Sequence, residues 1–457
     1  MLIDSKKLGP KFSEKPHPKA VYTSRPLSSY ISKCSSTNFT LNNYISKELE
    51  FDIDIESNKS NVLGTKRNIE ELNINSYENN EYQDTSSTKT AKALDDYVLL
   101  GRSGLRVSPL CLGTATFGEQ WGIGANKEES KKVFDLYYER GGNFFDTACN
   151  YNDGEGERFL GDYVSDKRSD VVIATKYTCN TTSMQKDVRL NPNLGGNHRK
   201  SLVENLNESL KRLNMSYVDI LYVHIYEFRT PIEEIMRSLD DAVRSGKVLY
   251  VAASNFPSWA LARANTFAEL RGWSSFIGLQ TRYSLLDRSL EFDLQPACAE
   301  LDVGIIPWGA VAEGFLTGKH TRESAANLKS EHRSHKVADH SKVEKNWKIL
   351  DDVITVSKET GRTPVQVAMN WVQQKPGITS PLIGARTVTQ LEENLKSLEF
   401  KLTPEQVKRL DEASKPAEIP FPNSFVSNYD RFIGKNIEVP RKFEAISTSC
   451  NFGRINL

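Results

Sequence analysis

Between about residues 96 and 415, short apolar runs alternate with longer segments of helical pattern. The runs are continuously apolar, which is typical of strands that are buried on both faces of a parallel sheet. Eight such runs lie at 110–112, 143–146, 171–174, 219–223, 248–251, 276–279, 304–307 and 378–383. Two further runs, 97–100 and 105–108, flank a glycine-containing turn and predict a β-hairpin.

Several segments between these runs carry a helix start signal. Thr230, Thr363 and Thr403 each precede a proline, and a Glu or Gln follows three residues after each threonine. This order predicts a threonine N-cap, a proline at the first helical position and a capping-box partner. We therefore expect a helix to begin at each of the three sites.

Eight strands alternating with helices predict a (β/α)8 TIM barrel with an N-terminal β-hairpin, which we place at residues 94–415. An open, doubly wound sheet is the alternative. That fold uses a GxGxxG sequence after its first strand to admit a pyrophosphate, and no such sequence follows the first run here. The pattern therefore favours the barrel.

Residues 1–93 lack a lasting apolar pattern and are rich in Ser, Asn, Lys and Thr. Such a segment cannot bury enough apolar surface to offset its ordering entropy, so we expect a disordered low-complexity extension. Organelle targeting by this basic, Ser-rich start is the alternative, but Asp4 comes early and no amphipathic Arg pattern follows. We expect residues 416–457 to form a C-terminal tail over one face of the barrel.

The composition excludes several classes of protein. Lys and Arg number 59 and Asp and Glu number 59, so the net charge is zero and a dedicated nucleic-acid binder is disfavoured. No apolar run is long enough for a membrane span. The six cysteines are scattered, which argues against a disulfide framework or a zinc site and favours a reducing compartment. We expect a cytoplasmic protein without a metal, and the residues define no oligomeric state.

Ionisable side chains close three consecutive runs. Asp146, Lys176 and His224 follow the second, third and fourth runs, and Tyr151 lies in the loop after Asp146. Because barrel active sites form at the carboxyl ends of the strands, we expect these four side chains to converge. A structural ion-pair network is the alternative for Asp146, Lys176 and Tyr151.

These residue types suit protonation of a carbonyl oxygen. A free tyrosine has a pKa near 10, and a neighbouring lysine ammonium is expected to lower it. A carboxylate keeps the lysine charged, and a histidine can hydrogen-bond a substrate carbonyl. A hydride donor is also needed, so a nicotinamide cofactor is implied.

Longer segments resemble the aldo-keto reductase family. These segments are 101–114, 145–161 with its Phe-Asp-Thr-Ala-Cys-Asn-Tyr, 246–256, 314–319 and 384–394. The resemblance covers about 96–415 and is greatest to the branch of aryl-alcohol dehydrogenase-like reductases and potassium-channel β subunits. It implies NADPH-dependent reduction of a small-molecule aldehyde or ketone, or the reverse oxidation. A regulatory or redox-sensing nucleotide-binding subunit is the alternative, although those subunits lack a histidine at position 224.

The resemblance also implies roles for individual residues. Tyr151 would be the general acid, Lys176 and Asp146 its tuning pair, and His224 the residue that orients the carbonyl. The implied cofactor contacts are Gly113, Thr114, Asp146, Ser254, Asn255, Gln280, Trp308, Gly309, Ala310, Val311, Ala312, Glu313, Lys319, Gly384, Ala385, Arg386, Gln390, Glu393 and Asn394. Among them Trp308 would face the nicotinamide ring, and the stretch from Gly309 to Glu313 with Lys319 would hold the pyrophosphate.

Arg386 indicates which nicotinamide cofactor is bound. It precedes Thr387, a predicted N-cap with Gln390 at N3, and a helix N-terminus after the eighth strand is where barrels bind phosphate. A guanidinium there can hold a 2′-phosphate, which favours NADPH over NADH.

Some positions depart from the family pattern. Gly156 stands where a serine is frequent, and Gly309-Ala310-Val311 replaces Ser-Pro-Leu in the pyrophosphate loop. Cys149 lies near the predicted lysine, which would favour a redox-sensitive thiolate. We nevertheless expect Cys149 to be a small buried residue, with the redox-sensitive thiol as the alternative.

Overall fold

A computed structural model describes residues 91–181, 189, 191–326, 333–428, 432 and 440–443. The predicted extension 1–93 therefore lies outside the described residues, except for its last three. Of these, Lys92 donates its backbone N–H to the carbonyl of Leu398 at 2.8 Å.

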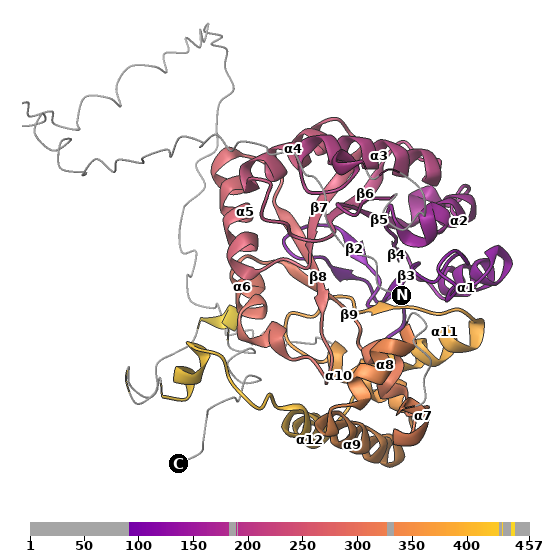
Figure 1. The fold of residues 1–457 in the computed structure, drawn as a ribbon, viewed down its shortest axis with the longest axis vertical. Helices are drawn as coiled ribbons and strands as arrows, with labels where there is room; N and C mark the ends of the chain where they lie inside the picture. Colours follow the sequence, from indigo (N-terminus) through magenta and orange to yellow (C-terminus); the bar gives the residue numbers. More distant parts are fainter. Residues whose placement is uncertain are drawn as a thin grey trace, which may run out of the picture. The chain divides into compact units, whose positions relative to one another are not determined.

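Eight parallel strands form one sheet in the order β10-β3-β4-β5-β6-β7-β8-β9 (Figure 1). The strands are β3 (Cys111–Gly113), β4 (Phe144–Asp146), β5 (Val172–Tyr177), β6 (Val218–Val223), β7 (Val248–Ser254), β8 (Phe276–Arg282), β9 (Gly304–Trp308) and β10 (Leu382–Ile383). A parallel bridge between Ile305 and Ile378 joins β9 to the segment before β10. The fold is thus the predicted (β/α)8 barrel.

Helices surround the strands, as Figure 1 shows. They are α1 (Lys127–Glu139), α2 (Glu155–Tyr163), α3 (Arg199–Leu213), α4 (Ile232–Arg244), α5 (Ser258–Arg271), α6 (Leu294–Glu300), α7 (Arg322–Ala326), α8 (Arg333–Ser341), α9 (Glu344–Thr360), α10 (Pro364–Gln373), α11 (Val388–Leu395) and α12 (Pro404–Ser414). In the part of the chain that the structure describes, none of the helices could cross a membrane.

Side chains of each strand alternate between two cores. Phe144 and Tyr222 belong to a small cluster of buried residues inside the barrel. Phe145 and Leu221, one residue along, belong to the larger cluster under the helices. This period of two explains the continuously apolar runs, since both faces of each strand are buried.

The predicted hairpin is formed by β1 (Val98–Leu99) and β2 (Arg106–Val107), which pair antiparallel. Leu100 and Val107 are fully buried in the cluster inside the barrel. The hairpin therefore closes the end of the barrel at which the strands begin.

Two of the three predicted capping boxes are present. Thr363 and Thr403 each accept the N–H of the Gln three residues on, and that Gln reaches back to the threonine N–H. The prediction for Thr230 is wrong, because α4 has Pro231 at its N-cap. The hydroxyl of Thr230 donates to the carboxylate of Glu227 in the preceding loop, and no side chain caps the helix.

The described part of the predicted tail contains a 3-10 helix, η8 (Asn423–Asn428). Further on, the ammonium of Lys442 lies 2.6 Å from the carboxylate of Glu300 at the end of α6. This ion pair brings the end of the described tail against the outside of the barrel.

Candidate active site

Three predicted site residues lie at positions whose side chains point into the barrel. Phe144 points into the barrel, and Asp146 follows two residues later in β4. Lys176 stands two residues after the inward Ala174 in β5, and His224 stands two residues after the inward Tyr222 in β6. All three lie at the carboxyl ends of neighbouring strands, so the sheet itself brings them together.

Lys176 is the centre of the site. Its buried ammonium forms an ion pair with the carboxylate of Asp146 and donates to the carbonyl of Thr147 at 2.8 Å. It also lies 3.5 Å from the hydroxyl oxygen of Tyr151 in the 3-10 helix η2 (Tyr151–Gly154). Gln280 of β8 donates to the other oxygen of Asp146 at 2.8 Å.

Burial and charge act against each other in the Lys176–Asp146 pair. Burial opposes the charge on Lys176, but Asp146 and Tyr151 outweigh it and raise the pKa of the lysine. Burial also raises the pKa of Asp146, which Lys176 and Gln280 offset in part. Since the two charges sit together with further hydrogen bonds, we take the pair as ionised.

The prediction that Lys176 lowers the pKa of Tyr151 below its ordinary value is wrong for the protein alone. Burial of the hydroxyl raises the pKa of Tyr151, and the ammonium offsets only part of that rise. Low polarity disfavours a phenolate more than a cation at 3.5 Å favours it. Tyr151 is therefore protonated at neutral pH.

His224 is a neutral imidazole. Burial, reinforced by the charge of Lys176, lowers the pKa of His224 to about 3. Its ring packs edge-on against Tyr151, with centroids 5.9 Å apart. The Nδ1 atom lies 3.6 Å from the sulfur of Cys179. The structure thus places a neutral hydrogen-bonding ring beside the tyrosine.

Cys149 behaves as the small buried residue rather than as a reactive thiolate. The residue is 1% exposed. Burial raises the pKa of its thiol far above the ordinary value, with a further contribution from Glu157, and the distant charges of Arg212 and Lys176 do not reverse this. This supports the expected small buried residue and disfavours the alternative of a lysine-stabilised thiolate.

Two residues beside Tyr151 and His224 have no signal in the strand-end pattern. Trp121, in the loop between β3 and α1, packs edge-on against Tyr151 with centroids 5.8 Å apart. Its indole N–H is buried without a partner among the described residues. Cys179 lies in the loop after β5. The sequence signal for these two residues is only a general rule. In barrels of this kind, the loops at the carboxyl ends of the strands line the active site.

The predicted nicotinamide contacts form a connected group. Asn255 follows Ser254 at the end of β7, and its side-chain amide donates to Ser254 Oγ and to the carbonyl of His224, both at 3.0 Å. Its side-chain oxygen accepts the indole N–H of Trp308 at 3.2 Å. Ser254, Asn255, Trp308 and His224 therefore lie together.

The predicted pyrophosphate loop has an unusual backbone. Gly309, Ala312, Glu313 and Gly314 all have positive φ, between 48° and 107°. The carboxylate of Glu313 lies 2.8 Å from Nε2 of His340 in α8, and this partner lowers the pKa of Glu313 although burial opposes the shift. Ala310 and Ala312 are buried, Val311 is partly buried and Lys319 is exposed.

The predicted contacts around α11 also come together. Thr387 accepts the N–H of Gln390 as the predicted N-cap. Gln390 accepts the N–H of Arg386 at 2.9 Å, and Asn394 donates to the carbonyl of Gly384 at 3.2 Å. The carbonyl of Ala385 accepts from Thr116, and that of Glu393 from Gln366. The guanidinium-bearing side chain of Arg386 is exposed.

Gly113 and Thr114 end the first barrel strand beside Asp146. Gly113 pairs with Asp146, and Thr114 donates its N–H to the carbonyl of Asp146 at 2.8 Å. The hydroxyl of Thr114 is buried without a partner among the described residues. It lies close to Gly156 of α2, on the side of the strand that faces the helices.

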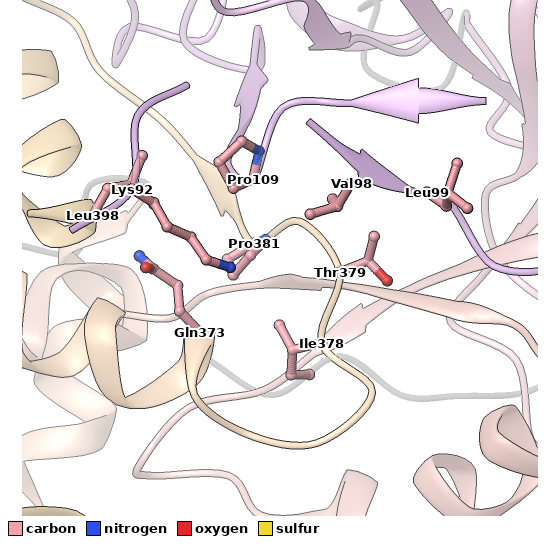
Figure 2. Close-up of a pocket in the computed structure, with 9 residues that line it drawn as sticks. All are labelled: Lys92, Val98, Leu99, Pro109, Gln373, Ile378, Thr379, Pro381 and Leu398. Carbon is pink, nitrogen blue, oxygen red and sulfur yellow. The ribbon is translucent and has the colours of Figure 1, made fainter. Parts of the chain in front are cut away.

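A separate cavity of about 180 Å³ lies at the opposite end of the barrel. Figure 2 shows its lining, which includes Leu99 of the hairpin and Pro109 and Pro381 just before β3 and β10. None of the predicted site residues lines it. The cavity is thus distinct from the candidate active site.

The model of the aldo/keto reductase family matches residues 109–415. This range includes the eight strands and every predicted site residue. The chain belongs to the aldo/keto reductase family. This match confirms the predicted family resemblance. It also identifies the protein as an oxidoreductase.

Curated aldo/keto reductase relatives are similar over most of their length. Norsolorinic acid reductase of Aspergillus flavus is 34% identical over 334 residues, which is 72% of this chain and 83% of the relative. Norsolorinic acid reductase stcV of Emericella nidulans is 34% identical over 337 residues, 72% of this chain and 84% of the relative. Aryl-alcohol dehydrogenase GME11368 of Pestalotiopsis microspora is 34% identical over 340 residues, 72% and 86% respectively.

Proposed function

We propose that this protein is an NADPH-dependent reductase of aldehydes or ketones, able also to run the reverse oxidation, with Tyr151 as the general acid. The observation that carries the proposal is the position of the Lys176 ammonium, between the carboxylate of Asp146 and the hydroxyl of Tyr151, with neutral His224 beside the tyrosine. The family membership and the names of the relatives support a carbonyl–alcohol conversion.

Each of the four side chains has a task in this reaction. Tyr151 holds the proton that the carbonyl oxygen receives, and the raised pKa keeps the tyrosine in this acid form. The Lys176 ammonium stabilises the tyrosinate that remains, and Asp146 keeps the lysine charged and in place. Neutral His224 donates a hydrogen bond to the carbonyl oxygen and orients it. In the oxidation direction the same tyrosinate accepts the alcohol proton.

Residues of this chain fit a nicotinamide dinucleotide. The cluster of Ser254, Asn255 and Trp308 lies at the same end of the barrel as Tyr151. The backbone of the predicted pyrophosphate loop turns sharply at Ala312, Glu313 and Gly314, which all have positive φ, and the exposed Lys319 would offer an ammonium to a phosphate. When bound, the cofactor supplies the hydride.

Arg386 supports NADPH as the preferred cofactor. Its side chain is exposed, while its backbone is held by Gln390 at the N-terminal end of α11. A guanidinium at a helix N-terminus is well suited to a 2′-phosphate, which NADH lacks.

The surroundings of Tyr151 support an aromatic or medium-chain carbonyl substrate. Trp121 and His224 pack edge-on against the tyrosine ring from different loops. An apolar side chain of the substrate would therefore meet aromatic surface next to the reacting carbonyl. We place the protein in the cytoplasm, which imaging of a fluorescent fusion of the full chain would test.

The proposal is tested by following NADPH absorbance with purified protein and a panel of aromatic and aliphatic aldehydes and ketones, with NADH as the comparison. We expect turnover that prefers NADPH and aromatic aldehydes. A folded protein that binds NADPH but turns over no member of the panel in either direction would contradict the reductase and favour a regulatory nucleotide-binding subunit.

A further inference from the structure

Cys179 contacts the ring of His224, the residue proposed to orient the carbonyl. The thiol sulfur of Cys179 lies 3.6 Å from Nδ1 of His224, and Cys179 is partly buried. The contact is within the range of a hydrogen bond involving sulfur. No role for this cysteine follows from the reaction described above.

The loop that carries Cys179 is held in place by several hydrogen bonds. The preceding Thr178 has φ of 109°, a conformation that a β-branched residue rarely adopts. Its hydroxyl donates to the side chain of Asn197 at 2.8 Å and accepts the backbone N–H of His224 at 3.2 Å. Strain of this kind persists where the surroundings impose it, and here it aims the next residue at the histidine.

The backbone of His224 is held independently of its ring. Its N–H donates to the carbonyl of Tyr177 at 3.1 Å, and its carbonyl accepts from Asn255 at 3.0 Å. Neither bond determines which ring nitrogen carries the proton. Among the residues that the structure describes, Cys179 is the one whose side chain contacts a ring nitrogen of His224.

The charge states of the two groups determine the direction of the hydrogen bond. Burial raises the pKa of Cys179, and the weaker influence of Lys176 does not reverse this, so the thiol keeps its proton. His224 is neutral, with a pKa lowered to about 3 by burial and by Lys176. A neutral imidazole has one acceptor nitrogen, which accepts a hydrogen bond more strongly than a thiol sulfur does. The thiol therefore donates to Nδ1.

We infer that Cys179 is a positioning residue that holds His224 in the tautomer with its proton on Nε2, so that Nε2 can donate to the carbonyl oxygen of the substrate. The inference rests on the proposed function. In the other tautomer Nε2 would present a lone pair to the carbonyl oxygen and would repel it. The thiol thus selects the reactive form of the ring without touching the substrate.

The test compares Cys179→Ala with Cys179→Ser, which keeps a short hydroxyl donor. Cys298→Ala is the matched control, because Cys298 is a buried cysteine of α6. For each protein we would record ¹⁵N spectra of labelled histidine without substrate and assign His224 among the seven histidines with His224→Gln. The kcat with an aldehyde and the KM for NADPH would be measured on the same samples.

We expect the wild type and the serine variant to show the Nε2–H pattern for His224, and the alanine variant to show a mixture of tautomers. The alanine variant should lose roughly tenfold in kcat, the loss expected for one hydrogen bond of ordinary strength, with an unchanged KM for NADPH. Cys298→Ala should retain both the spectrum and the kcat.

The inference is overturned if the wild type shows the Nδ1–H tautomer, or if Cys179→Ala keeps both the Nε2–H pattern and the wild-type kcat. An equal loss of kcat in Cys298→Ala would also contradict it, because the loss would then reflect packing. The spectra do not depend on turnover. If the wild type reduces no carbonyl but Cys179→Ala still changes the tautomer, the proposed function fails while the contact stands.

Discussion

The ammonium nitrogen of Lys176 lies 3.5 Å from the hydroxyl oxygen of Tyr151. Lys176 is fully buried and Tyr151 is partly buried, and Asp146 balances the charge of the lysine. The pKa of the tyrosine is nevertheless above its ordinary value because burial outweighs the cation. This arrangement of Lys176 and Tyr151 suits a general acid, which keeps its proton until a substrate oxygen accepts it.

Replacing Lys176 by methionine should reduce both activity and stability. The tyrosinate loses its neighbouring cation, so kcat should fall by about 10²–10⁴-fold. Asp146 is left as a buried, unpaired carboxyl group, which should cost about 3–5 kcal/mol in the free energy of unfolding at pH 7. Urea unfolding and NADPH absorbance measure the two effects. Lys396→Met, at an exposed lysine after α11, is the control, and equal losses in both variants would contradict the assignment.

Arg386→Gln should weaken the discrimination between the two cofactors. Loss of a charge-assisted contact to the 2′-phosphate should raise the KM for NADPH about tenfold and leave the KM for NADH unchanged. Arg102→Gln, at an exposed arginine of the hairpin turn at the other end of the barrel, should change neither. If Arg386→Gln raised both KM values equally, the 2′-phosphate contact would be the wrong explanation.

His224 should make stability fall at acidic pH. Its pKa is about 3 in the folded state and about 6.5 when unfolded, so between these values the unfolded chain binds the proton that the folded chain does not. The contribution of the neutral ring is therefore complete above pH 6.5 and is lost as pH falls toward 3.

His224→Gln removes this titration and provides the comparison. Relative to that variant, the wild type should lose up to about 2 kcal/mol of unfolding free energy between pH 6.5 and pH 5, measured by urea denaturation. If the difference between the two proteins stayed constant across that interval, the histidine would not be held neutral by the fold.

Gly156→Ser should be more stable than Gly156→Ala. A Cβ at this position in α2 would lie 3.4 Å and 3.5 Å from the hydroxyl oxygens of Thr147 and Thr114, both buried without a partner among the described residues. A serine hydroxyl can bond to them at the cost of a small shift from the carbonyl of Thr114, at 3.3 Å. Gly156→Ala shares the steric contact and lacks the hydroxyl. Thermal unfolding should show the serine variant more stable than the alanine variant by about 1 kcal/mol, and the reverse order would refute this account.

The sequence was sufficient to predict the barrel and the meeting of Asp146, Lys176 and His224. Each of these three residues lies at the end of a strand that is buried on both faces, so a continuous apolar run located the strand in the sequence. The closed sheet then brings the ends of neighbouring strands together. The helix predicted near Thr230 is present, but the threonine cap was wrong, because the hydroxyl of Thr230 lies against Glu227, a contact with no signal in the Thr-Pro pattern.

The pKa of Tyr151 was predicted in the wrong direction for a similar reason. A residue list shows which charges are available, but the depth of burial that opposes them depends on how neighbouring loops pack. Trp121 and Cys179 were missed because they lie in loops rather than at strand ends, and the contacts they make are set by backbone conformations such as that of Thr178.

The most direct test of the account is the kcat of Tyr151→Phe for NADPH-dependent reduction of an aldehyde, measured together with the dissociation constant for NADPH. The substitution removes only the hydroxyl that lies 3.5 Å from Lys176. We predict a loss of at least about 10²-fold in kcat with unchanged NADPH binding. A phenylalanine variant that reduces the aldehyde at the wild-type rate would contradict the assignment of Tyr151 as the general acid.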